Sequence, residues 1–580
     1  MPDNRVVKWL WGPLRKLVST IPERNLLLVL SLVTGVGCGL AAVLLKLSIG
    51  GLHRMVSSVV AWGGPWKYLI ILFPGVGMLL SLLIVRYLVR DDIGHGVTKV
   101  LVAVSKNESR IKKHNMWSSL VTSALTIGLG GSVGAEAPIV YTGAALGSNL
   151  ARYMGLSYRS MTVLLGCGAA GAVAGIFNAP LAGVLFVLEI LLFNLSMSSI
   201  LPLLFSTVSA TVVSYLCLGQ TTQFTCTLTA FSLHNLPFYL VLGVGCGLVS
   251  LYFMRMTLTL EDLLASLKNP WVRWALCAAA LGVLVYLLPP LFGEGYDSLT
   301  PLLNGVSTGK GLWFFALVLL LKVFSMTFTN AGGGVGGTFG PTLFSGAITG
   351  FVLASLLNLL WPGMVSIPNA VLVGMAGLMA GVMQAPMTAI FLIAEISGGY
   401  ALFLPLIITS SISYGVMRLF EKYSIYTKRI AKSGELLTHD SDQAVLTLLR
   451  TSSLIETDFT PVRIDATLGE LVEAVSASQR NIFPVLDGKK RFQGFIALAD
   501  IRRDMFRTDL YGKNHVYNYM MSAPAYVYPD VSMDSVMRKF ERTGAWNLPV
   551  VTPDRTYVGF VSKSRIFNAY RDELKNVSQD

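Results

Sequence analysis

The stretch Gly130-Gly-Ser-Val-Gly-Ala-Glu-Ala-Pro138 decides the fold class, because it sets a glycine-rich loop and a lone carboxylate, Glu136, inside an apolar region. A second stretch, Gly332-Gly-Gly-Val-Gly-Gly-Thr-Phe-Gly-Pro341, repeats this design later in the chain. In each stretch the proline stands where a helix can begin without losing a hydrogen bond. The free N–H groups and the helix dipole at such a start attract anions. Two of them in one membrane region predict half-helices that converge on a dehydrated anion.

The composition is that of a membrane protein. Of 580 residues, 53 % are hydrophobic and only 13 % are charged, which is far from the balance of a soluble protein. Residues 25–420 contain many long apolar runs, whereas the residues after 430 have an ordinary soluble composition. The runs predict a polytopic membrane protein with a soluble tail, and the basic N-terminus does not have the pattern of a cleavable leader. Representative runs are Leu26–Leu47, Tyr68–Leu88, Tyr239–Met256 and Gly311–Leu321.

The net charge of +13 has two interpretations. It is compatible with nucleic-acid binding, but membrane proteins also collect Lys and Arg on their cytoplasmic loops, and we favour that explanation. Basic clusters flank the membrane region at Arg5–Arg24, Lys106–Lys113 and Lys422–Lys432. They predict cytoplasmic termini, a cytoplasmic tail and no nucleic-acid partner. The six cysteines lie in the apolar part without Cys-x-x-Cys spacing, so neither a disulfide framework nor a metal site is expected.

The membrane region contains an internal duplication. Gly-Val-Gly-Cys-Gly-Leu occurs at residues 35–40 and again at 243–248. The segment Asn178-Ala-Pro…Glu189 is matched by Gln384-Ala-Pro…Glu395, in which the acid again follows the amide residue by eleven positions. Together with the two glycine-rich loops, these pairs follow the same order in both halves, which predicts a repeated unit. Hydropathy alone does not decide whether the repeat is parallel or inverted.

Three separated motifs follow one another along the membrane region: Gly134-Ala-Glu-Ala-Pro138, Gly337-Thr-Phe-Gly-Pro341 and Ser424-Ile-Tyr426. With the two Ala-Pro…Glu segments, they resemble the CLC family of chloride channels and chloride/proton antiporters. The resemblance implies an all-α membrane domain over residues 25–430, after a cytoplasmic segment at 1–24. It also implies inverted repeat halves at about 25–220 and 235–430, and a homodimer in the lipid bilayer with one anion pore per subunit.

The resemblance also assigns roles to residues at the pore. Glu136 would be the gating glutamate, whose carboxylate competes with chloride for an anion site, and its neighbours Ala135 and Ala137 would line that site. The alternative for Glu136 is a helix cap past which no ion moves. The backbone N–H groups of Thr338 and Phe339 would hold the central chloride. Tyr426 would add its hydroxyl, although a lone tyrosine at a membrane end is often an interfacial residue.

Two departures from the family pattern concern anion binding. The first filter element is usually Gly-Ser-Gly-Ile-Pro, but here it reads Gly94-His95-Gly96-Val97-Thr98. Either the His95 imidazole faces the anion, more strongly when protonated, or it points elsewhere and a backbone N–H such as that of Gly96 does the work. At the position before the gating glutamate, where the family usually has an arginine, this chain has Ala135. Lys322 is a candidate to supply part of the missing positive electrostatic field.

A third departure concerns protons. Family antiporters commonly carry two adjacent glutamates at the end of the Asn-Ala-Pro helix, but in this chain Ile190 follows Glu189. An alkyl side chain cannot relay a proton, which favours a passive channel or an antiporter with a different proton route. We expect Glu189 and Glu395 to cap or brace helices.

The tail contains a second duplication, in which each unit has a helix, two short apolar strands and a further helix. Asn481-Ile-Phe-Pro-Val-Leu486 is answered by Asn547-Leu-Pro-Val-Val551. This α+β tail resembles a pair of CBS domains, at residues 453–512 and 513–576, after a linker at 431–452. The nucleotide-binding pattern of such pairs is half-matched in each unit, by Asp500 in the first and Ser562 in the second. Adenine-nucleotide sensing and a purely structural, dimer-bracing role both remain open.

The sequence therefore predicts a multi-pass membrane protein, not an enzyme, that transports chloride through a CLC-type pore gated by Glu136. We favour a passive, voltage-gated-type channel in a bacterial plasma membrane. The alternatives are a chloride/proton antiporter with a non-standard proton route and a transporter of another small anion, such as fluoride or nitrate. A cation transporter would need several carboxylates within the spans, where Glu136, Glu189 and Glu395 stand alone.

Overall fold

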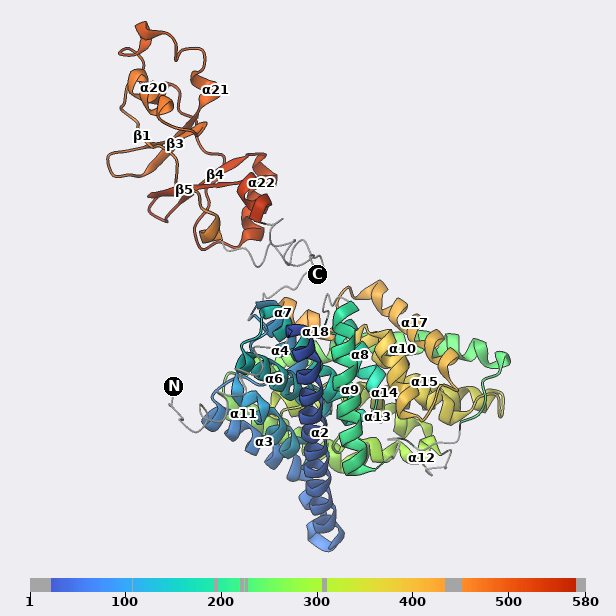
Figure 1. Cartoon of the computed structure of the whole chain (residues 1–580). Helices are drawn as coiled ribbons and strands as arrows, with labels where there is room; N and C mark the ends of the chain where they lie inside the picture. Colours follow the sequence, from blue (N-terminus) through green and yellow to red (C-terminus); the bar gives the residue numbers. More distant parts are fainter. Residues whose placement is uncertain are drawn as a thin grey trace. The chain divides into compact units, whose positions relative to one another are not determined.

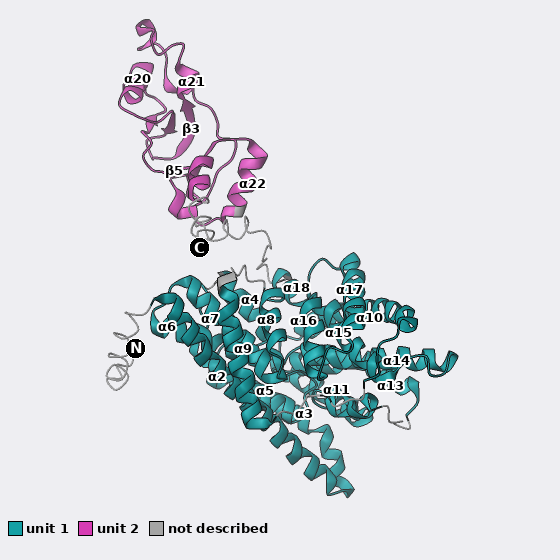
Figure 2. Cartoon of the chain, turned by 45° about the vertical axis from the view of Figure 1, so that its right-hand side comes forward, with its two compact units in different colours: residues 1–436 teal, residues 437–580 magenta. Residues whose placement is uncertain are grey.

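The computed structural model describes residues 22–106, 108–191, 197–219, 224, 228–304, 310–432 and 451–569. The chain forms two compact units, residues 1–436 and 437–580, which are coloured separately in Figure 2. Nearly all of the basic segment 1–24, most of the linker 431–452, the last residues of the second tail unit and Cys226 lie outside the described residues.

Unit 1 is helical throughout its described part. Eight of its described helices are long and apolar enough to cross a membrane, and the bent pair Gly64–Ile71 with Phe73–Val89 would make a ninth. This agrees with the predicted polytopic membrane domain. Its principal helices are α2 (Glu23–Ala61), α3 (Phe73–Leu83), α4 (Gly96–Lys106), α5 (Ser118–Gly128), α6 (Glu136–Met154), α7 (Tyr158–Phe177), α8 (Pro180–Glu189), α9 (Met197–Leu218), α10 (Leu236–Ala265), α11 (Pro270–Leu287), α12 (Thr300–Leu303), α13 (Leu312–Ala331), α14 (Phe339–Leu360), α15 (Ile367–Met383), α16 (Pro386–Ile396), α17 (Phe403–Phe420) and α18 (Ile425–Lys432).

The duplication in the sequence is also a duplication in the structure. Helix α2 packs on α9 as α10 packs on α17, and α6 packs on α7 as α14 packs on α15. Asn178 and Gln384, which open the repeated Ala-Pro segments, both adopt left-handed backbone conformations, with φ of 58° and 54°. Each ends one helix, and a proline two residues later begins the next. Corresponding sequence signals therefore produce corresponding turns in both halves.

The two short helices α8 and α16 cap one another. The Glu189 carboxylate, at the end of α8, accepts hydrogen bonds from the backbone N–H groups of Met387 and Thr388 at 3.1 and 2.7 Å, at the start of α16. The Glu395 carboxylate, in the last turn of α16, accepts from the N–H groups of Leu181 and Ala182 at 3.1 and 2.9 Å. Each acid thus satisfies the free donors of the other helix. The helices run antiparallel, as inverted repeats require, and the expected capping role of both acids is observed.

Small residues let the central helices approach closely. A Cβ on Gly143 of α6 would lie 2.2 Å from the Gly168 carbonyl oxygen of α7, and a Cβ on Gly346 of α14 would lie 2.4 Å from the Gly374 carbonyl oxygen of α15. No side chain fits at these crossings. Small residues at helix crossings are how membrane helices gain packing without a hydrophobic driving force.

Unit 2 is α+β and carries the predicted duplication. Strand β2 (Ile482–Leu486) lies between β1 (Val462–Arg463), with which it is parallel, and β3 (Phe492–Ala497), with which it is antiparallel. Strands β4 (Asn547–Val551) and β5 (Tyr557–Ser562) form the matching antiparallel pair. Helices α20 (Leu468–Ser476) and α22 (Met533–Thr543) precede the two hairpins, and α21 (Leu498–Ile501) follows the first. The register in both hairpins shifts at the same relative position, next to Val485 and Val550, so the two units share their detailed geometry.

Candidate functional site

The two glycine-rich loops meet in the middle of unit 1. The Gly134 N–H donates to the Gly337 carbonyl oxygen at 3.0 Å, and the Gly337 N–H donates back to Gly134 at 2.7 Å. A Cβ on Gly134 would lie 2.1 Å from Glu136 Oε2 and 2.7 Å from the Gly340 nitrogen, so the close approach requires glycine. Helices α6 and α14 therefore begin side by side, as the sequence predicts, with their N-terminal donors facing a common region.

Glu136 joins the two loops. It is the first residue of α6 and is only 3 % exposed. Its carboxylate accepts a hydrogen bond from the Gly340 N–H at 3.2 Å and from the Tyr296 hydroxyl at 3.1 Å. One bond thus comes from the start of the other half-helix, so Glu136 is more than a cap for its own helix. N–H groups at a helix start are also the groups that bind free anions in proteins.

Thr338, Phe339 and Tyr426 gather at the start of α14. The Thr338 hydroxyl is buried and makes no hydrogen bond within the part of the chain that the structure describes. The Tyr426 hydroxyl faces it and lies 3.3 Å from the sulfur of Met383. The ring of Phe339, 1 % exposed, packs against Phe177 with centroids 5.5 Å apart.

The start of α4 brings Gly96 and His95 to the same region. A Cβ on Gly96 would lie 2.4 Å from the carbonyl oxygen of Ala137, so α4 packs directly on the first turn of α6. His95 has a φ of +36°, and its Nε2 lies 3.7 Å from a carboxylate oxygen of Glu261. Arg429 of α18 donates to the same oxygen at 2.6 Å. The imidazole therefore faces a mixed-charge cavity of about 270 Å³. Its lining residues are Gly94, His95, Glu261, Ala265, Arg273, Asn330, Ala331, Gly334, Val335 and Gly336.

A second carboxylate, that of Glu294, lies close to Glu136 and was not predicted from the sequence. The N–H of Ala135, where the family has an arginine, donates to the Glu294 carboxylate at 3.0 Å. Lys322 is fully buried, and its Nζ donates to the Ser132 hydroxyl at 2.9 Å and to the Glu294 backbone carbonyl at 3.2 Å. Lys322 thus lies next to the first loop, where the sequence made it a candidate to replace part of the arginine's field. The segment Gly293-Glu-Gly-Tyr296, with its acid between two glycines, was the available signal for Glu294 and Tyr296.

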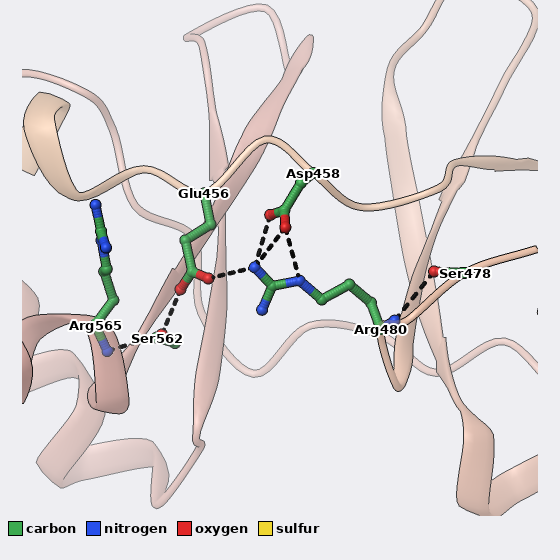
Figure 3. Close-up of polar contacts among 6 residues, drawn as sticks. All are labelled: Glu456, Asp458, Ser478, Arg480, Ser562 and Arg565. Carbon is green, nitrogen blue, oxygen red and sulfur yellow. Dashed lines mark hydrogen bonds and ion pairs between the residues drawn. The ribbon is translucent and has the colours of Figure 1, made fainter.

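The tail has its own polar cluster, which Figure 3 shows. Arg480 donates to Asp458 at 2.7 Å and to Glu456 at 2.8 Å. The Arg480 guanidinium holds the pKa of Asp458 below its ordinary value. The Ser562 hydroxyl donates to the other oxygen of Glu456 and accepts from the Arg565 N–H at 3.1 Å. The predicted serine is therefore already engaged by a carboxylate.

Two known sequence families match this chain. Residues 76–418 match the family described as voltage gated chloride channel, and residues 516–572 match the CBS domain. The first match covers more than half of the chain and includes both glycine-rich loops. The second covers the later of the two tail units.

Individual relatives extend the comparison. The chloride channel protein CLC-f of Arabidopsis thaliana is 25 % identical over 536 residues, which cover 78 % of this chain and 68 % of that protein. The H(+)/Cl(-) exchange transporter ClcA of Vibrio cholerae is 31 % identical over 296 residues, which cover 49 % of this chain and 62 % of that protein. The crystal structure of a slow cyanobacterial Cl-/H+ antiporter superposes with a TM-score of 0.64 at 24 % identity, covering 71 % of this chain and 98 % of the other. This last likeness concerns the fold alone.

Proposed function

The chain belongs to the voltage gated chloride channel family, and from this premise we propose that it is a passive chloride channel gated by Glu136. The single observation that carries the proposal is the position of the Glu136 carboxylate on the Gly340 N–H, at the start of the facing half-helix. Chloride that reaches this amide must displace the carboxylate, because one N–H cannot serve two anions. Protonation has the same effect, since a neutral carboxyl is a weaker acceptor.

The central anion site lies at the two residues just before Gly340, Thr338 and Phe339. The N–H groups of Thr338 and Phe339 are at a helix start and have no acceptor within their own helix. The buried Thr338 hydroxyl and the Tyr426 hydroxyl that faces it add two further groups able to donate. Several neutral donors at one helix start suit a small dehydrated anion such as chloride. They do not suit a cation, which needs oxygen acceptors.

The environment of Glu189 supports passive conduction. The side chain after it is that of Ile190, which is buried and cannot carry a proton. Glu189 itself accepts three hydrogen bonds at the start of α16, including one from the Thr388 hydroxyl at 2.8 Å. These three contacts hold the Glu189 carboxylate on the first turn of α16 as a helix cap, which gives it a structural task.

Coupled exchange with protons is the second candidate, because relatives of this chain include proteins named as exchangers. The pair His95 and Glu261, 3.7 Å apart on the wall of the cavity, provides ionisable groups for a different proton route. Selection of another anion, such as fluoride or nitrate, follows if the imidazole contacts the ion. These alternatives differ from the channel proposal in their response to a pH gradient.

We propose a multi-pass arrangement in a bacterial plasma membrane, with the tail in the cytoplasm. Helices α4 and α18 lie at one end of unit 1 and α12 at the other (Figure 1). The α4 and α18 end carries Lys112, Lys113 and Lys428, and the positive-inside rule assigns it to the cytoplasm. The antiparallel pair α8 and α16 leaves Leu181 and Met387 exposed, at 39 % and 48 %, and we assign this apolar face to the subunit contact of a homodimer.

An adenine nucleotide does not fit the tail cluster. The position that needs an acid for the ribose holds Arg565, and the Ser562 hydroxyl is engaged by Glu456. The nearby guanidinium of Arg480 is already paired with Asp458 and Glu456, so it is not available to a phosphate. We therefore propose a structural role for the tail.

Radiolabelled chloride and rubidium uptake into liposomes tests the proposed function. Purified protein should admit chloride and not rubidium, and Glu136→Ala should change the chloride rate. The matched control is Glu108→Ala, which deletes an exposed carboxylate outside the pore. Rubidium uptake, or chloride uptake indifferent to Glu136→Ala, would refute the proposal.

A further inference from the structure

Glu294 occupies an amide of the first glycine-rich loop. Its Oε1 accepts the Ala135 N–H at 3.0 Å, although the two residues are 159 positions apart in the chain. Ala135 is the N-cap of α6, so its N–H belongs to the group of helix-start donors that attract anions. Glu294 is partly exposed, whereas Glu136 is buried. Glu294 is therefore nearer to solvent than Glu136.

The two carboxylates use the two half-helices in the same manner. Glu136 accepts the Gly340 N–H at the start of α14, and Glu294 accepts the Ala135 N–H at the start of α6. Tyr296, two residues after Glu294, donates its hydroxyl to Glu136. The Gly293–Tyr296 segment thus contacts both the first loop and the gating side chain. It precedes α12, at the end of unit 1 opposite to α4 and α18 (Figure 1).

The charges around Glu294 make its hydrogen bond to the Ala135 N–H sensitive to pH. Glu136 follows Ala135 directly in the chain and Glu294 accepts the Ala135 N–H, so two carboxylates of like charge lie at the same loop and repel each other. Two lysines oppose this repulsion: Lys46 of α2, which is partly exposed, acts on Glu294 from a distance, and the buried Lys322 of α13 donates to its backbone carbonyl. The remaining groups that face Glu294 are the Tyr296 hydroxyl and the carboxylate of Asp297, which lies 3.7 Å from His53.

We propose that Glu294 is a second gating carboxylate, which holds the anion position at the Ala135 N–H and must leave before chloride can enter from that end. This inference rests on the proposed function, because it concerns the same anion pathway. Two gates in series then control that entrance, a deep one at Glu136 and a shallow one at Glu294. A proton or an arriving chloride ion opens the shallow gate by removing the carboxylate from the amide.

A structural alternative is that Glu294 only braces the first loop. In that case its loss would lower stability without altering how chloride uptake depends on pH. The variant Glu294→Gln separates the two roles, since its neutral amide oxygen still accepts the Ala135 N–H but carries no charge and does not titrate. The matched control is Glu108→Gln, which neutralises an exposed carboxylate outside the pore, paired with Arg110 at 3.1 Å.

The experiment measures chloride uptake into liposomes as the pH on the Glu294 side is lowered from neutral, for the unmodified protein, Glu294→Gln, Glu294→Ala and Glu108→Gln. We expect uptake at neutral pH to rise at least several-fold in Glu294→Ala. The increase in uptake on acidification should be reduced in both Glu294 variants and unchanged in Glu108→Gln.

The possible outcomes are distinct. If the unmodified protein takes up no chloride, the proposed function itself fails. If it takes up chloride but Glu294→Gln keeps the original pH profile, only the second gate is refuted. If Glu294→Ala does not fold, the profile of Glu294→Gln decides alone, because that variant keeps the hydrogen bond to Ala135.

Discussion

Deleting the Glu136 carboxylate should tighten chloride binding. In the folded protein this side chain accepts the Gly340 N–H at 3.2 Å and the Tyr296 hydroxyl at 3.1 Å. Chloride must break at least the first of these contacts to reach the amide. The change Glu136→Ala removes the competitor and leaves the backbone donors in place, since Ala is tolerated at the start of a helix.

The size of the effect follows from the contact that is lost. A hydrogen bond to a charged group contributes about 1.5–3 kcal/mol, and every 1.4 kcal/mol is a tenfold change in affinity. Because only the Gly340 N–H is contested directly, we expect chloride to bind about 10- to 100-fold more tightly to Glu136→Ala. The bond to Tyr296 adds to the competition, but that hydroxyl can rotate to another acceptor.

Isothermal titration of chloride into detergent-purified protein measures this affinity. The control is Glu108→Ala, whose deleted carboxylate is exposed and paired with Arg110 at 3.1 Å. That variant should bind chloride as the unmodified protein does. An unchanged dissociation constant in Glu136→Ala would mean that the carboxylate does not compete for the anion site, and the gating argument would be wrong.

Three further predictions follow from single contacts. Glu189→Ala and Glu395→Ala should each lower the free energy of unfolding by a similar amount, about 1–2 kcal/mol, because Glu189 caps α16 and Glu395 caps α8. Thermal melting in detergent measures both losses, and a large difference between the two variants would contradict the reciprocal capping. Lys322→Met should lower the free energy of unfolding by at least about 2 kcal/mol, since the Ser132 hydroxyl and two carbonyl oxygens lose their hydrogen-bond partner. An unchanged melting temperature would show that these hydrogen bonds do not stabilise the fold. ATP or AMP should not raise the melting temperature of the full chain, and a shift that Ser562→Ala abolishes would show that the tail cluster binds a nucleotide after all.

The sequence predicted the membrane fold because its signals are local and occur twice. Each signal can be recognised in one continuous segment of sequence: the glycine-rich loops, the Ala-Pro helix starts and the long apolar runs. Their repetition predicts the duplicated architecture. The meeting of Gly134 with Gly337 follows from the same logic, since both loops open half-helices in corresponding positions of the repeat.

Glu294 and Tyr296 could not be placed in this way. They reach Ala135 and Glu136 across about 160 residues of intervening chain, through packing that no local pattern encodes. Counting only Glu136, Glu189 and Glu395 as carboxylates of the spans therefore missed the one that faces the first loop. The direction of His95 depended on a backbone φ of +36°, which a histidine rarely adopts and which sequence reasoning does not anticipate.

The most direct test of the account is the reversal potential of the purified protein in planar bilayers under a chloride gradient, with and without a pH gradient. A passive channel gated by Glu136 should reverse at the chloride equilibrium potential, and the pH gradient should not move that value. A reversal potential displaced by the pH gradient would contradict passive conduction and would mean that protons move by a route other than Glu189.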